Sequence, residues 1–256
     1  MDKINSGVIS GLYLIGISSF IIPIAVQVYM KRKYDAGTVV FLIGAFAYMV
    51  ISWVRGIFRA VILNDQVRES PVLFYFLSAL LSGVFEEVGR YLVFRYVIPN
   101  KDRYSNAVSY GAGHAGFEIA VVSGVKAFSF ASLCSRFNES GLSAVTKGMT
   151  DTQIRHTESV LKGFADDTLY DTFSGVFSVV TGLAGHIAFS VIVFTAVHYA
   201  FDKKYLFIAI ALHTAFDFVT PFYASAPAVI FLIFYLHILT FALVWFSYKL
   251  YKKSTA

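Results

Sequence analysis

Long apolar runs alternate with short polar segments along this chain. Each run approaches or exceeds the roughly 20 residues that a helix needs to cross the hydrocarbon core of a bilayer. We therefore predict an all-α, polytopic transmembrane helical bundle of about seven helices, forming a single integral-membrane domain over residues 1–256. The predicted helices cover residues 6–29, 38–58, 71–97, 107–130, 173–200, 205–221 and 225–248.

The longest polar insertion, residues 132–171, has a helical pattern of its own. Ile154, Leu161 and Phe164 fall on roughly one helical face, and Thr150 precedes them as a candidate N-cap. This pattern predicts one amphipathic interfacial helix lying on the membrane. Two interpretations remain open for it: a solvated connecting helix, or an interfacial lid beside a site.

Composition and charge agree with a membrane protein. The chain is 57% hydrophobic and 14% charged, whereas an average soluble domain has roughly 25% charged residues. The net charge of +5 comes from basic residues clustered at the ends of apolar runs, which indicates membrane topology rather than nucleic-acid binding. If the helices alternate in direction, the balance of Lys and Arg predicts a multi-pass protein of the cell membrane with its N-terminus outside and its C-terminus in the cytoplasm.

Ionisable residues within the predicted spans break the apolar pattern. An ionised side chain at the bilayer centre costs about 2.5 to 3.5 kcal/mol on insertion scales, so such residues usually face a polar interior. At ~1.5 Å of rise per residue, most of them fall close to the midpoints of their helices. We predict that they converge on one polar pocket. They are Glu86, Glu87 and Arg90 on residues 71–97, His114 and Glu118 on 107–130, His186 on 173–200, and His213 and Asp217 on 205–221.

Two adjacent acids share one helix with a single arginine. Arg90 follows Glu87 by three residues and Glu86 by four, so both acids are within helical reach of it. Because one guanidinium neutralises only one of them well, we expect the other carboxylate to be free for chemistry. Arg55 lies nearer a predicted helix end, and we interpret it as a cation that reaches the interface.

The residue types point to hydrolysis. Imidazoles and carboxylates are ligands of Zn²⁺, so Zn²⁺ is a candidate cofactor. A carboxylate beside a metal-bound water, or beside an ordered water without metal, can act as general base. The chain contains no HExxH and no GxSxG motif, which disfavours the soluble zincin and serine mechanisms. The metal-ligand candidates are His114, His186, His213 and Glu118.

Three motifs carry a family resemblance. "FEEVGRY", "GAGHAGFE" and "ALHTAFDF" occur in this order on successive predicted helices. They resemble the YhfC-type intramembrane metallopeptidases, distant relatives of the CAAX-protease and bacteriocin-processing (CPBP) clan and of PrsW-type membrane proteases. The CAAX branch has EExxxR and the PrsW branch EExxK, whereas this chain reads EExxR.

The resemblance assigns expected roles to the first two motifs. It implies that Glu86 activates the attacking water and that Arg90 holds Glu87. His114 would position that water or a metal ion. The expected activity is hydrolysis of a peptide bond at or within the bilayer.

The third motif adds two residues to this expectation. His213 would also position the water or metal or, with Asp217, stabilise the oxyanion. Glu118 and His186 match more loosely, and His186 is a candidate third imidazole ligand. The implied partner is a membrane-embedded or membrane-anchored peptide substrate, in a bacterial plasma membrane.

Two other functions compete with the peptidase. Chains of acids and histidines inside a membrane also carry protons, so a non-enzymatic transporter or proton relay is one alternative. Inverted repeats or helices broken by Gly or Pro would support it, and the sequence has neither; Pro221 and Pro227 lie at the turn between the last two predicted helices. The other alternative is a pseudoprotease that binds transmembrane partners.

Overall fold

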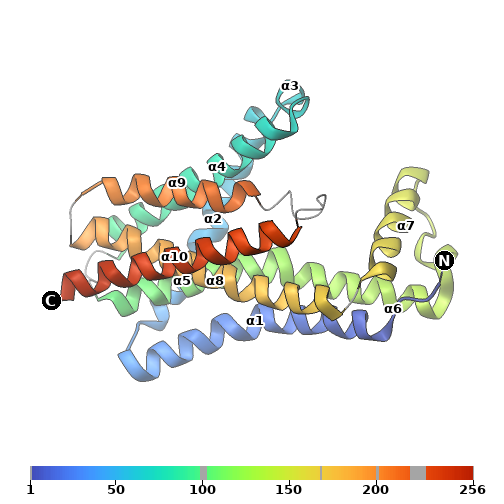
Figure 1. The fold of residues 1–256 in the computed structure, drawn as a ribbon, viewed down its shortest axis with the longest axis horizontal. Coiled ribbons are helices and arrows are strands. Elements are labelled where there is room, and N and C mark those ends of the chain that lie inside the picture. The colour runs from blue at the N-terminus through green and yellow to red at the C-terminus, as the bar shows by residue number, and fades with distance from the viewer. Residues whose placement is uncertain (1, 99–102, 168, 200–201, 220–228, 256) are drawn as a thin grey trace. The chain divides into compact units, whose positions relative to one another are not determined.

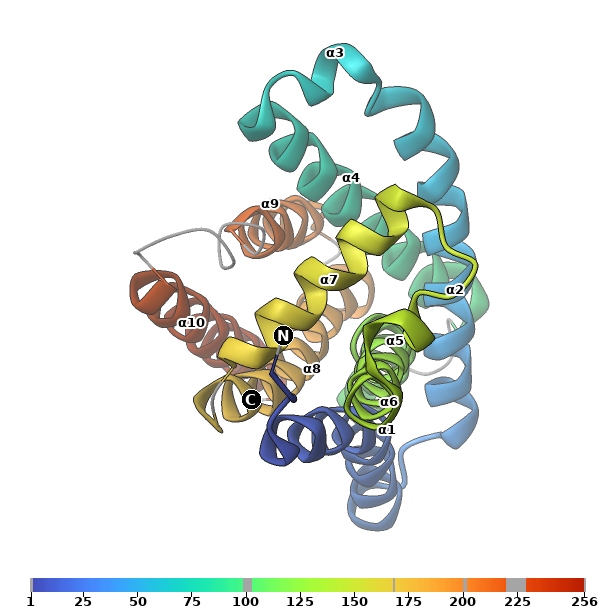
Figure 2. The same ribbon diagram turned by 90° about the vertical axis from the view of Figure 1, so that its right-hand side faces the viewer.

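The protein is helical throughout the part that the structure describes. The computed structural model (Figures 1 and 2) describes residues 2–98, 103–167, 169–199, 202–219 and 229–255, and within these ranges it has no strand. The all-α prediction is therefore confirmed. The elements are α1 (Ser6–Tyr34), α2 (Thr38–Ile62), α3 (Asp65–Arg68), α4 (Pro71–Leu92), the π-helical turn η1 (Val93–Val97), α5 (Tyr104–Ile119), the π-helical turn η2 (Ala120–Val125), α6 (Lys126–Val145), α7 (Asp151–Asp166), α8 (Leu169–His198), α9 (Lys204–Val219) and α10 (Val229–Thr255).

Five helical runs in the described part of the chain are long and apolar enough to cross a membrane. The chain is thus a multi-pass membrane protein, and the runs overlap the first five predicted helices. Helices α9 and α10 occur where the sixth and seventh were predicted, although α9 has only 16 residues. The orientation of the termini stays a prediction. The five runs are Ser6–Tyr34, Thr38–Ile62, Pro71–Val97, Tyr104–Val145 and Phe173–His198.

The fourth run extends further than predicted. Helix α5 continues through η2 into α6, which ends at Val145 rather than near residue 130. Ala131, Cys134 and Phe137 recur every three residues on one face of α6 and are buried, so apolar packing prolongs the helix into the polar insertion. Gly141, with φ of 77°, interrupts the helical geometry near its end.

The chain divides into two compact units, which we call unit 1 and unit 2. Unit 1 comprises residues 1–22 and 118–180, and unit 2 comprises residues 23–117 and 181–256. The boundaries fall inside the continuous helices α1, α5 and α8. A single integral-membrane domain stays a prediction.

Helix α7 of unit 1 is the amphipathic helix predicted in the polar insertion. It begins at a capping box, in which Thr150 Oγ1 accepts from the Gln153 backbone N–H and the Gln153 side chain accepts from the Thr150 N–H. Its Leu161 is fully buried and its Phe164 packs against the same apolar cluster, which α1 and α6 complete. Much of the apolar face of α7 therefore packs against protein, and a membrane-surface position stays a prediction.

In unit 2, glycine residues let the helices that carry the polar residues approach closely. Helix α4 lies beside α2 and α9 in both ribbon views (Figures 1 and 2). A Cβ atom at Gly83 of α4 would lie 2.8 Å from the backbone oxygen of Ile210 on α9, and one at Gly113 of α5 would lie 1.9 Å from the oxygen of Phe41 on α2. Small residues are the usual means of close packing between membrane helices. These contacts bring the predicted pocket residues of α4 and α9 together and place α5 against α2.

Candidate functional site

Helix α4 holds the two acids and the arginine in the interior of unit 2. Glu86 is 1% exposed, and Glu87 and Arg90 are fully buried. Arg90 Nη1 donates to both carboxylate oxygens of Glu87, at 3.1 Å each. The i to i+3 pair thus forms, as expected for residues one helical turn apart.

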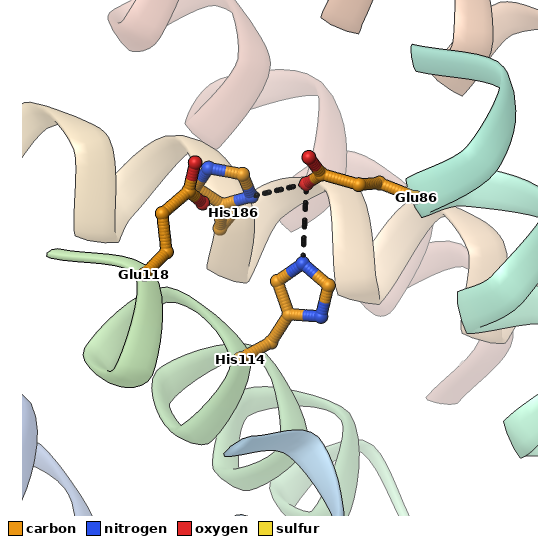
Figure 3. Close-up of side chains that lie close together, drawn as sticks. All are labelled: Glu86, His114, Glu118 and His186. Carbon is orange, nitrogen blue, oxygen red and sulfur yellow. Dashed lines mark hydrogen bonds and ion pairs between the residues drawn. The ribbon is translucent and has the colours of Figure 1, made fainter. Parts of the chain in front are cut away.

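Glu86 faces three imidazoles with one of its oxygens. Its Oε2 lies 3.2 Å from Nε2 of His114, 3.9 Å from Nδ1 of His186 and 3.8 Å from Nε2 of His213. Figure 3 shows His114 from α5 and His186 from α8 both directed at this oxygen. Four helices therefore supply one carboxylate and three imidazoles to a common point, which is the convergence predicted for these residues.

Glu87 orients one of these imidazoles. Its Oε1 lies 2.6 Å from Nδ1 of His213. An ionised carboxylate only accepts, so Nδ1 donates and Nε2 is the nitrogen directed at Glu86. The ring of Phe189 stacks on His213 at 4.8 Å between centroids and an angle of 4°. A carboxylate and a stacked ring thus fix both the tautomer and the plane of His213.

The other two histidines are also held in place. Nδ1 of His186 lies 3.4 Å from Nη2 of Arg90, and because a guanidinium only donates, Nδ1 is the acceptor. The ring of His114 packs edge-on against Tyr48, with centroids 5.1 Å apart. Among the described residues, His114 Nδ1 is buried without a hydrogen-bond partner. Through its bonds to Glu87 and to His186, Arg90 connects the buried carboxylate of Glu87 with the imidazole of His186.

Arg55 is a site residue that the sequence interpretation missed. Its Nη1 donates to Oε1 of Glu86 and, at 2.9 Å, to Oγ of Ser82, and its side chain is only 14% exposed. The prediction that it reaches the interface was wrong: α2 continues to Ile62, so Arg55 is not close to the helix end, and its side chain pairs with Glu86 on α4. Glu86, the acid that Arg90 does not hold, is thus paired with Arg55 through Oε1, and its freedom for chemistry stays a prediction. A cation within an apolar run was the signal that could have revealed it.

Two further predicted residues lie around this centre. Oδ2 of Asp217 is 3.7 Å from Nε2 of His213, but its side chain is 32% exposed, so it lies at the edge of the site. Glu118 follows His114 by one turn on α5. Figure 3 shows it beside His186.

The donor set fits a divalent metal ion. One ligand atom from each of Glu86, His114, Glu118 and His186 can be chosen so that all four lie within 4.8 Å of one another. Zinc bonds of about 2.0 to 2.2 Å in tetrahedral geometry need ligand atoms roughly 3.5 Å apart, a distance within reach of small side-chain rotations. This group includes Glu86 in place of the predicted His213, whose Nδ1 is held by Glu87. The predicted ligand set therefore stays a prediction.

Comparison with known proteins identifies the family. Residues 18–237 match the family described as YhfC intramembrane metalloprotease. The chain is also 28% identical over 222 residues to the uncharacterized membrane protein YhfC of Bacillus subtilis (strain 168), covering 80% of this chain and 81% of that protein. No solved structure matches significantly. Because the family match spans most of the sequence, the chain belongs to the YhfC intramembrane metalloprotease family.

Proposed function

We propose that the protein is an intramembrane peptidase that hydrolyses a peptide bond at or within the bilayer, using Glu86 as the general base. The main support is the asymmetric setting of this carboxylate. Arg55, which also donates to Ser82, anchors Oε1, whereas Oε2 faces the imidazoles of His114, His186 and His213. A buried carboxylate with one anchored and one reactive oxygen is suited to moving a proton at a fixed position.

The proton transfers follow from this placement. Oε2 of Glu86 accepts a proton from a water molecule, and the oxygen of that water attacks the peptide carbonyl carbon. The carbonyl electron pair moves to oxygen and forms a tetrahedral oxyanion. Glu86 then returns the proton to the amide nitrogen, the C–N bond breaks, and the products are a carboxyl group and an amine. A single carboxylate thus serves first as base and then as acid.

The neighbouring residues orient the reacting groups. Glu87 is bonded to both Arg90 and His213, so we assign Glu87 and Arg90 the role of orienting His213 rather than of contacting substrate. His213, with Asp217 beside it, is placed to bind the water or to stabilise the oxyanion. Nε2 of His114 lies 3.2 Å from Oε2 of Glu86, and His114 would position the same water.

A metal ion is the cofactor that these donors would bind. We propose Zn²⁺, held by three of His114, His186, Glu118 and His213, which keeps one position open for water and leaves Glu86 free to act as the base. Such an ion would polarise the scissile carbonyl and lower the pKa of its bound water. The geometry of His213 supports this assignment, because Glu87 holds its Nδ1 and leaves Nε2, which lies 3.8 Å from Glu86 Oε2, as the ligand atom.

Replacing Glu86 by Gln tests the peptidase. The amide keeps the size of the side chain but cannot accept the proton, so we expect cleavage to fall by at least about 100-fold, the lower range for general acid–base catalysis. Mass spectrometry of new N-termini in membranes from cells with wild type or Glu86→Gln protein measures this loss. The exposed Glu139→Gln is the matched control. Equal sets of cleaved membrane peptides in the two strains would contradict the proposal.

Metal analysis tests the cofactor. We expect purified wild-type protein to bind about one Zn²⁺ per chain. His114→Ala should lower the affinity by at least tenfold, since it removes a direct ligand, and His213→Ala should also lower it if His213 contributes. His156 is exposed on α7, so His156→Ala is the control and should keep the metal. Equal zinc affinity in wild type and His114→Ala would argue against this metal site while leaving the glutamate-activated water in place.

The competing functions are distinguishable by the same variants. A proton relay through Glu86 and His213 would produce proton flux across proteoliposomes, read with an entrapped pH-sensitive dye and lost in Glu86→Gln. A pseudoprotease would cleave no peptide even as the wild-type protein, and its Glu86→Gln variant would still bind the partner. Neither pattern is expected for the peptidase.

A further inference from the structure

Two adjoining cavities lie in unit 2, at the end where the last turn of α1, the first turn of α5 and the last turns of α10 occur (Figure 1). Their volumes are about 360 Å³ and 610 Å³, within the range of ligand sites. Both are lined by Tyr34, Tyr104, Ser105 and Tyr251. The shared lining means that a single ligand can extend from one cavity into the other.

The smaller cavity, which we call the apolar chamber, is lined mostly by apolar groups. Met30, Val108, Val191 and Val244 contribute aliphatic surface from four helices. Tyr104 forms part of its wall, with its ring edge-on to Tyr251 at 5.2 Å and its hydroxyl 3.0 Å from Oγ1 of Thr195. This chamber fits a hydrocarbon chain.

The larger cavity, which we call the basic cavity, is lined by Arg32, Lys33 and Arg103. Arg103 Nη2 donates to the backbone oxygen of Tyr34 at 2.6 Å, which orients its guanidinium. The one acid in the lining is Asp35, which is paired with Lys31. The hydrogen bond from Lys31, the charge of Lys31 and the charge of Arg103 hold the pKa of Asp35 below its usual value. Asp35 therefore stays ionised, and Lys31 neutralises its charge. The cavity keeps an excess of positive charge.

A hydrogen-bonding group lies at the junction of the two cavities. Ser105 lines both, and its Oγ is buried without a hydrogen-bond partner among the described residues. Buried polar atoms are nearly always paired. The Ser105 hydroxyl is therefore suited to a ligand that has a polar group between its charged and apolar parts.

We infer that these cavities together bind one glycerophospholipid with an anionic headgroup. Arginine forks match phosphate oxygens, so Arg32 and Arg103 would hold the phosphate in the basic cavity. The Ser105 hydroxyl would donate to an ester oxygen, and one acyl chain would occupy the apolar chamber. Free phosphate would fill only the basic cavity and leave the apolar chamber empty, whereas a lipid would fill both. This site is separate from the Glu86 centre and does not depend on peptidase activity.

Native mass spectrometry of the full-length protein in detergent tests the site. We expect wild type to retain one dioleoyl-phosphatidylglycerol in preference to dioleoyl-phosphatidylcholine. Arg32→Gln with Arg103→Gln should weaken phosphatidylglycerol binding by about tenfold, in keeping with the attraction of surface basic residues to anionic lipid. Arg95→Gln with Lys253→Gln removes the same charge from exposed positions outside both cavities and should retain binding.

Two further arms separate the lipid from free phosphate. Val244→Trp fills the apolar chamber and should weaken phosphatidylglycerol binding several-fold, whereas Val97→Trp, exposed and outside the lining, should not. Glycerol 3-phosphate should not displace the lipid. Displacement by it, equal losses in the two double variants, or equal binding of the two lipids by wild type would each overturn the inference.

Discussion

The interiors of the two units are built from different chemistry. In unit 1, Leu161 lies in an apolar cluster, and one polar contact ties Asn138 to the backbone of Ile4 through hydrogen bonds of 2.8 and 2.7 Å. In unit 2, Glu86, Glu87 and Arg90 are buried among three histidines. Neutral packing is sufficient to hold a helix in place, whereas buried charge is costly unless every charge is paired. The interior of unit 2 therefore indicates a functional requirement that the interior of unit 1 does not.

The largest expected effect on stability comes from breaking the buried pair in unit 2. Arg90→Met leaves Glu87 without its guanidinium, so we expect a loss of about 3 to 5 kcal/mol in the free energy of unfolding. Chemical unfolding in detergent measures this loss. The exposed Arg95→Gln should stay within about 0.5 kcal/mol of wild type.

A second variant separates charge burial from simple packing. Glu87→Gln combined with Arg90→Met removes both charges and should recover more than half of the stability that Arg90→Met loses. An additive or larger loss in the double variant would mean that the pair contributes through shape rather than through charge.

Sequence patterns predicted the helices and the composition of the polar centre, but not its pairing. Length and hydropathy located the membrane runs, and the depth of His114, His186 and His213 predicted their convergence. The contact between Arg55 and Glu86 depends on how α2 packs on α4, and that between Glu87 and His213 joins residues 126 positions apart. Such contacts depend on close approach at residues such as Gly83. Spacing along one helix does not encode them.

An intermediate effect is expected from the apolar interior of unit 1. Leu161 is fully buried, so Leu161→Ala should cost about 2 to 4 kcal/mol through lost burial and a residual cavity. Hydrogen exchange should show the loss of protection in α7 and α6, while zinc binding by the unit 2 residues His114 and His186 remains. The control is Leu42→Ala, which is 59% exposed on α2 and should change stability by less than about 1 kcal/mol. Loss of zinc binding in Leu161→Ala would show that the two interiors are not independent.

The smallest stability effect is expected at the edge of the polar centre. Asp217 is 32% exposed and its Oδ2 lies 3.7 Å from His213 Nε2, so water screens the pair and Asp217→Asn should change the free energy of unfolding by less than about 1 kcal/mol. The loss in cleavage rate, expressed as a free energy, should exceed the loss in the free energy of unfolding, since Asp217 is next to Nε2 of His213, which faces Glu86. Cleavage rates and unfolding curves of the same preparation separate the two effects. A stability loss as large as that of Arg90→Met would place Asp217 among the interior charges and remove the distinction between the centre and its edge.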